Sequence, residues 1–341
     1  MLSETEVLDA AADVAKILPR TPTVTSEWFD QRLSSTLFFK CENLQRTGSF
    51  KVRGVLTALR RLPPERRRRG VHAYSSGNHA LALAWAGARL GIPVTVLMPW
   101  DAPDVKVAGA RHHGATVLRY DRYTDDRESL ARELAESAGT TLIPSADSAD
   151  IVAGQGTAAV ELIDEVGPLD VLVVPVGGGG LAAGTVLAAK ALSPGCEVVG
   201  VEPANGNDAE LSLRHGRLVS IDTPRTIADG AQVRHLGRLP FAILREHGTR
   251  VVTADDAELV ETMALISQRL HIVAEPTACL PLAAVLAGAV PVAGRRIGVL
   301  ISGGNVDLGR YAHLLGGGPA GADRQPGSEP SSSRRPCEVR G

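Results

Sequence analysis

The sequence predicts an α/β protein in which helices cover both faces of parallel sheets. Short apolar runs alternate with helical patterns along most of the chain, which is typical of strands joined by crossover helices. The chain has 341 residues, of which 44% are hydrophobic and 22% charged, an ordinary composition for a globular protein. At roughly 100–200 residues a domain, this length fits two domains, and a looser polar stretch at 139–150 is the expected crossover.

The expected elements follow in order from the hydrophobic periodicity. A capping box at Ser3 and Glu6 begins a first helix that continues to Leu18, and a second helix is expected over Gly48–Arg61. Strands are expected at Thr36–Cys41, Val71–Tyr74, Val94–Met98, Thr116–Arg119, Val171–Val176, Glu197–Val201 and Ile297–Ser302. Later helices are expected at Asn78–Leu90, Asp125–Ser137, Thr157–Val166 and Ala257–Arg269. Residues 316–341 lack periodicity and are rich in Gly, Pro, Ser and Arg, which predicts a disordered tail.

Composition and charge exclude several classes of partner. The formal net charge is −2, so no global field favours nucleic acid, and the charge run Arg66–Arg69 is expected to be solvated. No apolar run is long enough to span a bilayer, and the N-terminus lacks the pattern of a signal peptide. The cysteines show no metal-binding or disulfide spacing. We therefore expect a cytoplasmic protein without nucleic-acid or membrane partners.

Four segments contain residues suited to catalysis or ligand binding. Each of them follows or opens a regular element, as sites in parallel sheets do. The first is Gly48-Ser49-Phe50-Lys51 at the start of a helix. The partial positive charge of the helix N-terminus opposes protonation of Lys51, which favours a neutral amine for covalent catalysis. Taken alone, such a lysine is about ten times more often a plain surface residue.

The second segment is Ser75-Ser76-Gly77-Asn78-His79, between a strand and a helix. Small residues and free amides at a helix N-terminus form a seat for an anion such as a carboxylate, and the hydroxyl of Ser76 could also move a proton. Simple capping would explain half of this motif, because Ser and Asn are favoured at N-caps.

The third segment is a tetrad of glycines that follows the strand Val171–Val176. A glycine backbone approaches a phosphate closely with its amides directed inward. The spacing Gly177-x-Gly179-x-x-Ala182, followed by Glu202 near the end of the next strand, also satisfies a dinucleotide fingerprint. The tetrad alone therefore does not exclude an NAD-dependent dehydrogenase. The tetrad consists of Gly177, Gly178, Gly179 and Gly180.

The fourth segment, Ser302-Gly303-Gly304-Asn305, follows the strand Ile297–Ser302. The Ser302 hydroxyl could hydrogen-bond a ring nitrogen. In isolation, a strand-to-helix turn with a serine and two glycines explains this segment better.

In this order, the segments resemble the fold-type II pyridoxal-phosphate (PLP) family of serine/threonine dehydratases and serine racemases, from roughly Thr5 to Leu314. The resemblance implies a tryptophan synthase β-like fold with two parallel-sheet domains, the active site in the cleft between them, and a homodimer. The large PLP-binding domain would comprise 1–68 plus 146–315, and the small domain 69–145. Further matching segments are Lys40-Cys41-Glu42, Gly154-Gln155-Gly156-Thr157 and Glu275-Pro276-Thr277-Ala278.

The resemblance also implies a role for each segment. Lys51 would bind PLP covalently and act as the base at the substrate Cα, while the tetrad cradles the PLP phosphate. Because the Ser302 hydroxyl cannot hold the ring nitrogen protonated as a carboxylate would, the ring favours loss of a β-hydroxyl, which yields a 2-oxo acid and ammonia. Around the ring, Phe50 would pack on its face and Asn78 would contact its 3′-oxygen. Groups near the small-molecule substrate would be Ser75, Ser76, His79 and Arg127, although Arg127 fits a surface helix charge nearly as well.

A metal site and two departures from the family pattern complete the resemblance. Glu202-Pro203-x-x-Gly206-x-Asp208 resembles the divalent-cation site of the racemases, and carboxylates with a carbonyl and waters suit Mg²⁺ or Ca²⁺. Without the resemblance, this segment would be an acidic turn. Leu81 stands where glutamine is common, and Cys279 where glycine is usual, so both bear on pocket shape.

The leading functional hypothesis is an L-threonine or L-serine ammonia-lyase. Serine racemase is an alternative, because Ser76 opposite Lys51 would allow reprotonation on either face of Cα. A threo-3-hydroxyaspartate ammonia-lyase is another, and it requires an extra cation, from Arg127 or His79, near the side chain. An NAD-dependent oxidoreductase leaves Lys51 and Ser302 unexplained. A non-catalytic binding protein would be favoured only if Lys51 or Ser76 were replaced.

Overall fold

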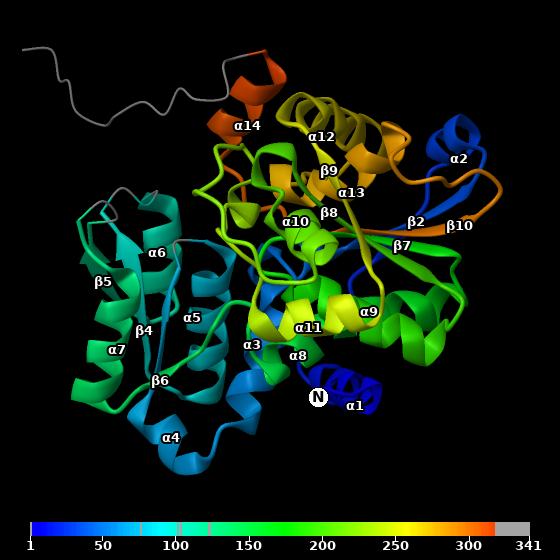
Figure 1. Ribbon diagram of the computed structural model, residues 1–341. Helices are drawn as coiled ribbons and strands as arrows, with labels where there is room; N and C mark the ends of the chain where they lie inside the picture. Colours follow the sequence, from blue (N-terminus) through cyan, green and yellow to red (C-terminus); the bar gives the residue numbers. More distant parts are fainter. Residues whose placement is uncertain (1, 76, 101, 103, 122–123, 318–341) are drawn as a thin grey trace, which may run out of the picture.

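The computed structural model describes residues 2–75, 77–100, 102, 104–121 and 124–317. Ser76 and the predicted tail beyond residue 317 therefore lie outside the described residues. Ten strands form two sheets within the described part (Figure 1). The six-stranded large sheet has the order β1-β2-β10-β7-β8-β9, and the four-stranded small sheet has the order β5-β4-β3-β6. All pairings are parallel except that of β1 with β2, which confirms the predicted fold class.

The seven predicted strands are present with ends shifted by at most two residues. In the large sheet, β7 has every residue buried, because helices cover both faces of a parallel sheet. The strands of the large sheet are β1 (Thr23–Val24), β2 (Thr36–Cys41), β7 (Val171–Pro175), β8 (Glu197–Pro203), β9 (Arg250–Ala254) and β10 (Arg296–Ile301). Those of the small sheet are β3 (Val71–Tyr74), β4 (Val94–Pro99), β5 (Thr116–Tyr120) and β6 (Thr141–Leu142).

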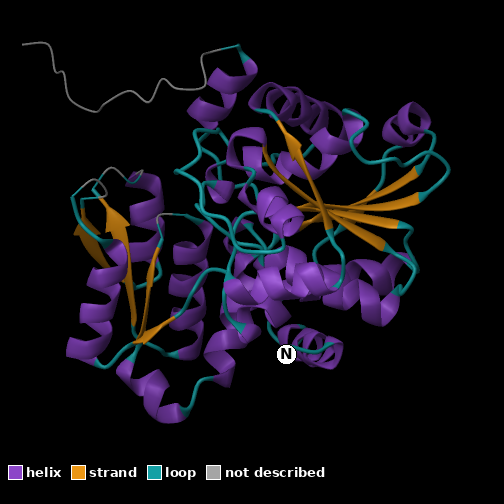
Figure 2. Ribbon diagram, viewed as in Figure 1, coloured by secondary structure: helices purple, strands orange, loops and turns teal. Residues whose placement is uncertain are grey.

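Helices surround both sheets (Figure 2). The capping box of Ser3 and Glu6 is formed and begins the first helix. The α-helices are α1 (Glu4–Val14), α2 (Glu27–Leu33), α3 (Lys51–Arg61), α4 (Pro64–Arg69), α5 (Asn78–Leu90), α6 (Asp104–His112), α7 (Arg127–Ala138), α8 (Ala149–Val166), α9 (Gly180–Leu192), α10 (Asp208–His215), α11 (Arg238–Glu246), α12 (Asp256–Leu270), α13 (Pro276–Leu286) and α14 (Leu308–Leu315). Single 3₁₀ turns are η1 (Glu42–Leu44), η2 (Arg46–Gly48), η3 (Ala204–Gly206) and η4 (Asp229–Ala231).

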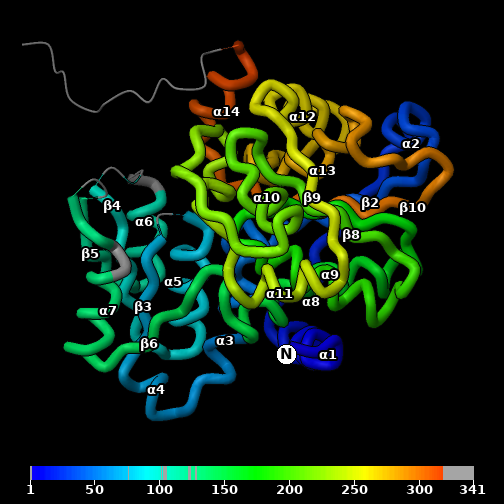
Figure 3. The backbone as a smooth tube through the Cα atoms, viewed as in Figure 1, coloured from blue at the N-terminus to red at the C-terminus, as the bar shows by residue number. Residues whose placement is uncertain are grey.

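Two apolar clusters cover the faces of the large sheet. One contains residues of α2, α12, α13 and α14, and the other contains residues of α1, α8, α9 and α11. A third cluster belongs to the small sheet and includes the apolar side of α3. The tube view shows the chain leaving the large sheet at α3 and returning to it at α8 (Figure 3). We propose that the two sheets mark the two expected domains, with α3 between them.

Two helix starts differ from the prediction by more than two residues. The helix expected from Gly48 begins at Lys51, because Gly48 has φ +70° in the preceding turn, a conformation that favours glycine. The helix expected from Thr157 begins at Ala149. A Cβ on Gly154 would lie 2.6 Å from Cα of Gly54, so glycine there allows α8 to approach α3 closely.

A buried ionic network anchors α3 beside its first residue. Arg53 is fully buried, and its guanidinium donates to Glu42 at 2.6 Å and to Glu161 at 2.7 Å. Lys40 is also fully buried and pairs with Glu161 at 2.9 Å. Because two cations face two carboxylates, the charges balance without water. The network holds α3 to β2 and α8, and thereby fixes the residues that precede Arg53.

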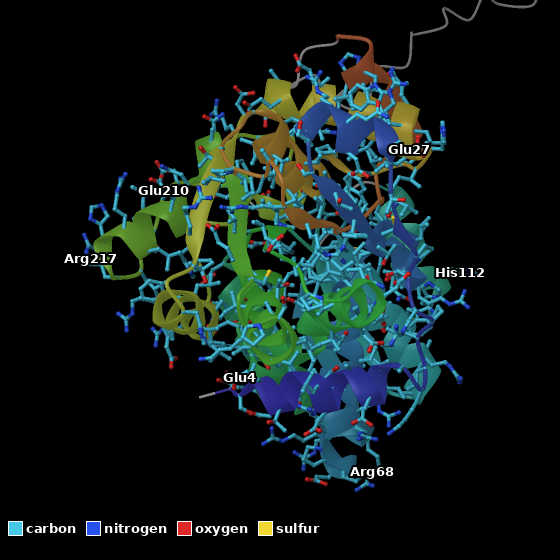
Figure 4. All side chains as sticks on the ribbon, turned by 90° about the vertical axis from the view of Figure 1, so that its right-hand side faces the viewer. Glu4, Glu27, Arg68, His112, Glu210 and Arg217 are labelled. Carbon is cyan, nitrogen blue, oxygen red and sulfur yellow. The ribbon has the colours of Figure 1, made fainter. Side chains whose placement is uncertain are left out.

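The surface of the chain agrees with two sequence predictions. The run Arg66–Arg69 forms the largely exposed helix α4, and Figure 4 shows Arg68 pointing away from the body of the protein. No helix among the described residues has the length and apolar character needed to cross a membrane.

Candidate active site

The segments that contain Lys51 and Ser302 are joined by backbone hydrogen bonds. Phe50 N donates to Ser302 O at 3.1 Å, and Gly304 N donates to Gly48 O at 2.9 Å. A bridge between Ser49 and Gly303 lies between these bonds. Since β10 ends at Ile301, this pairing places the start of α3 at the carboxyl edge of the large sheet, where sites of parallel sheets form.

Lys51 lies half-buried at this edge. Its ammonium donates to the carbonyl of Ser145 at 3.1 Å and lies 4.9 Å from the ring centroid of Phe50. Burial lowers the pKa of Lys51 to about 8, although the charge of Glu275 acts in the opposite direction. The direction agrees with the sequence prediction, but the cause is desolvation. Burial therefore makes the neutral amine of Lys51 easier to reach near physiological pH than that of a solvated lysine.

The glycine tetrad packs so closely against its neighbours that side chains would clash there. A Cβ on Gly177 would lie 2.9 Å from Gly230 O, and one on Gly178 would lie 2.8 Å from Cβ of Ala146. Gly179 has φ +85° and precedes the first residue of α9, Gly180. The tetrad thus leads into the N-terminus of α9, and helix N-terminal amides bind phosphate. The tetrad therefore fits the phosphate of PLP.

Asn78 lies at the centre of a hydrogen-bond chain between the two sheets. Its Nδ2 donates to Oε1 of Glu275 at 2.8 Å, and its Oδ1 accepts from Nδ2 of Asn305 at 2.9 Å. Asn305 Nδ2 also donates to Thr47 O at 2.7 Å. This chain fixes the side chain of Asn78 next to the Lys51 segment.

Glu275 is a site residue to which the sequence analysis assigned no role. Its side chain is buried, and desolvation with the nearby charge of Asp229 raises its pKa to about 8. Burial therefore disfavours the charged form of the Glu275 carboxyl. The available signal was an acidic residue next to an apolar run, 276–286, since buried carboxyls need partners.

His79 is buried and neutral. Its Nε2 bonds to Ile143 O at 2.9 Å, and its Nδ1 has no partner among the described residues. Burial, with a contribution from the charge of Lys51, lowers the pKa of His79 to about 4. This desolvation disfavours the charged form of His79 that a second substrate carboxylate would need, so the substrate role of His79 stays a prediction.

The remaining site candidates fall into two groups. Ser302 is buried, and its hydroxyl forms no hydrogen bond with any described residue, which leaves it free for a ring nitrogen. Ser75 is half-buried, and its Oγ accepts from Gly77 N at 3.3 Å, as a capping residue would. Arg127 is the first residue of α7, but its side chain, like Ser76, lies outside the described part.

The two departures from the family pattern do not sit at the Lys51 amine. A Cβ on Gly109 of α6 would lie 2.8 Å from Cδ2 of Leu81, so Leu81 packs between α5 and α6. Cys279 is buried one turn after Glu275, and its thiol bonds to Glu275 O at 3.5 Å.

The expected metal ligands lie together at the end of β8. Glu202 is buried and accepts from the amides of Ala209 at 3.1 Å and Glu210 at 2.8 Å. Asp208 is buried, and its Oδ2 has no hydrogen-bond partner in the described part of the chain. Three clustered His, Cys, Asp or Glu side chains are not found among the described residues. The orphaned carboxylate oxygen fits a cation, whose other ligands would be Glu202, the carbonyl of Gly206 and waters.

We expect cation removal to destabilise the protein. Burial raises the pKa values of Glu202 and Asp208 to about 8 and about 7. Without a cation, the native state then holds more protons than the unfolded chain, so stability falls as the pH rises from about 4 towards 8. A bound cation would offset this loss. EDTA at pH 8 should lower the Tm of the wild type by about 3 °C or more, and less at pH 6.

The Glu202→Ala variant should barely respond to EDTA. Glu210→Ala is the matched control, because the Glu210 side chain bonds to Asn207 and Arg214 rather than to Glu202, and Figure 4 shows it on the outer side of α10. This control should respond as the wild type does. Equal EDTA responses in wild type and Glu202→Ala, measured by differential scanning fluorimetry, would favour the acidic turn without a metal.

Comparisons with known proteins identify the family. Residues 14–303 match the family described as "Pyridoxal-phosphate dependent enzyme". The L-threo-3-hydroxyaspartate ammonia-lyase of a Pseudomonas species is 52% identical over 92% of this chain and 98% of that protein. The serine racemase of Schizosaccharomyces pombe is 49% identical over 91% of this chain and 96% of that protein. The crystal structure of serine racemase from Dictyostelium discoideum superposes with a TM-score of 0.85 at 36% identity, covering 90% of this chain and 99% of that one.

These matches reject the NAD-dependent alternative, because the family's cofactor is PLP. The chain belongs to the fold-type II family of pyridoxal-phosphate-dependent enzymes, with ammonia-lyases and serine racemases among its relatives.

Proposed function

We propose that the protein is an ammonia-lyase that converts L-threo-3-hydroxyaspartate into oxaloacetate and ammonia. The observation that carries the lyase chemistry is the depressed pKa of Lys51, about 8, beside a serine rather than a carboxylate at position 302. The substrate comes from the hydroxyaspartate ammonia-lyase that is 52% identical to the chain. This proposal replaces the threonine or serine substrate that the sequence analysis favoured.

Each site residue has a part in this proposal. The bound PLP supplies an electron sink for the substrate Cα. Lys51 holds the cofactor and removes the Cα proton, for which its lowered pKa provides a neutral amine. The tetrad binds the phosphate, and Phe50 packs on the ring face. Asn78, fixed by Glu275, contacts the ring oxygen.

The substrate-binding residues and the net reaction complete the proposal. The parts of Ser75, Ser76, His79 and Arg127 in binding the substrate stay predictions. The substrate loses its β-hydroxyl as water, and hydrolysis of the resulting imine consumes one water and releases ammonia. The net products are therefore one oxaloacetate and one ammonia. The homodimer and the cytoplasmic location also stay predictions.

Serine racemase is the second candidate, supported by the relative from Schizosaccharomyces pombe at 49% identity. Racemisation differs from elimination because it needs a second acid that protonates Cα, and Ser76 is the candidate for this acid.

Product analysis of the wild-type holoenzyme separates these functions. L-threo-3-hydroxyaspartate, L-serine and L-threonine are supplied separately, and 2-oxo acid, ammonia and serine enantiomers are measured. We expect oxaloacetate and ammonia in a 1:1 ratio from hydroxyaspartate, with kcat/KM at least about tenfold above that for the other two substrates, since a charged substrate group adds a charge-assisted contact. Faster formation of D-serine than of any 2-oxo acid would replace the lyase by the racemase.

A further inference from the structure

One lysine of the small sheet reaches a loop of the large sheet. Lys106 on α6 donates to Oδ2 of Asp229 in η4 at 3.0 Å. The Lys106 side chain is 19% exposed, whereas that of Asp229 is 48% exposed. The two residues are 123 positions apart, and α6 is labelled beside the small sheet in Figure 1. The pair therefore connects the two halves of the protein.

The pair lies next to a segment that contacts the glycine tetrad. Gly230, next to Asp229, packs with its carbonyl against Gly177 of the tetrad, and its amide donates to Oγ1 of Thr277 at 3.0 Å. The charges of Lys106, Asp229 and Lys51 all act on the carboxyl of Glu275. The ammonium of Lys106 is thus within electrostatic reach of the same buried carboxyl as the Lys51 amine.

A dicarboxylic substrate needs a second cation, and the structure limits the choice. Lys51 is engaged by the cofactor, and His79 stays uncharged because burial lowers its pKa to about 4. Lys106 carries three donors, and an ion pair with a half-exposed partner such as Asp229 is weak. A substrate carboxylate could therefore share Lys106 or displace Asp229 towards water at little cost.

We propose that Lys106 binds the side-chain carboxylate of a dicarboxylic amino-acid substrate and thereby sets the preference for hydroxyaspartate over serine. This proposal rests on the proposed function of the site. Its consequence is a selectivity that depends on one ammonium group, whereas a purely structural role for the Lys106–Asp229 pair would affect all substrates alike.

The kinetic test compares Lys106→Met and Lys106→Arg with the wild-type holoenzyme. In Lys106→Met, the ratio of kcat/KM for L-threo-3-hydroxyaspartate to that for L-serine should fall about 10- to 100-fold, the usual effect of losing a hydrogen bond to a charged group. Lys106→Arg should keep part of the preference because it keeps the charge. Lys190→Met is the control, since Lys190 pairs only distantly with Glu4 at 3.6 Å on the surface, and it should not change the ratio.

A binding test does not depend on turnover. Succinate has two carboxylates but neither amine nor hydroxyl, and butyrate is its monocarboxylate counterpart. Calorimetric titration of the holoenzyme should show tighter binding of succinate, and Lys106→Met should remove that difference. Arg127→Met should leave it in place.

The outcomes separate the two proposals. A wild type that binds succinate through Lys106 but releases no oxaloacetate would refute the proposed function and support the inference. An unchanged substrate ratio and unchanged succinate binding in Lys106→Met would overturn the inference, as would loss of the preference in Arg127→Met alone.

Discussion

Replacing Lys51 with alanine should abolish the release of ammonia and 2-oxo acid. The variant loses both the covalent attachment of the cofactor and the base at Cα, and a positioned base alone contributes about 10²–10⁴-fold to the rate. We expect kcat/KM to fall by at least about 10⁴-fold. The fold should survive, because within the described part of the chain the Lys51 ammonium makes one hydrogen bond, to a backbone carbonyl, and burial disfavours its charged form by lowering its pKa.

The controls for this variant distinguish chemistry from folding. Its far-ultraviolet circular dichroism should match that of the wild type, and its visible cofactor absorbance should be lost. A small primary amine added to the medium should restore part of the activity by replacing the missing base. Retention of more than a tenth of the wild-type kcat/KM, with a native spectrum, would contradict the assignment of Lys51.

Replacing Arg53 with methionine should cause the largest loss of stability. Arg53 is fully buried between Glu42 and Glu161, and its removal leaves two buried carboxylates with Lys40 as the remaining cation of the network. Breaking a buried ion pair by removing one partner costs about 3–5 kcal/mol. The free energy of unfolding, measured in urea, should fall by about that amount.

Arg61→Met is the matched control on the same helix. Arg61 pairs with Asp150 at 2.9 Å, but both side chains are about a third exposed, and such pairs contribute at most about 1 kcal/mol. If the free energy of unfolding fell by similar amounts in the two variants, burial would not be the reason that the Arg53 network stabilises the protein.

Local patterns predicted much of the fold. The buried strands and the tetrad follow from apolar runs and glycines, which are visible in a few consecutive residues. The start of α8 could not be predicted, because Gly154 and Gly156 have low helix propensity. Their place inside a helix depends on contacts with Gly54 and Gly184 of neighbouring helices, which the sequence does not reveal.

The charged partners of the site were also beyond local reasoning. The recognisable segments of the sequence included Lys40, Glu42 and Glu275. Their roles could not be predicted, because the side chains that they contact are far away in the sequence. Arg53 and Glu161 are 108 positions apart. Lys106 had no distinguishing motif at all, and only the folded chain brings it to Asp229.

The covalent site of the cofactor can be read out directly on the wild-type holoenzyme. Sodium borohydride reduces the bond between PLP and the lysine that holds it, which fixes the cofactor to that residue, and mass spectrometry of proteolytic peptides then locates the added mass. We predict that the modified residue is Lys51. Modification of Lys40, Lys106 or Lys190 in place of Lys51 would contradict the account of the active site.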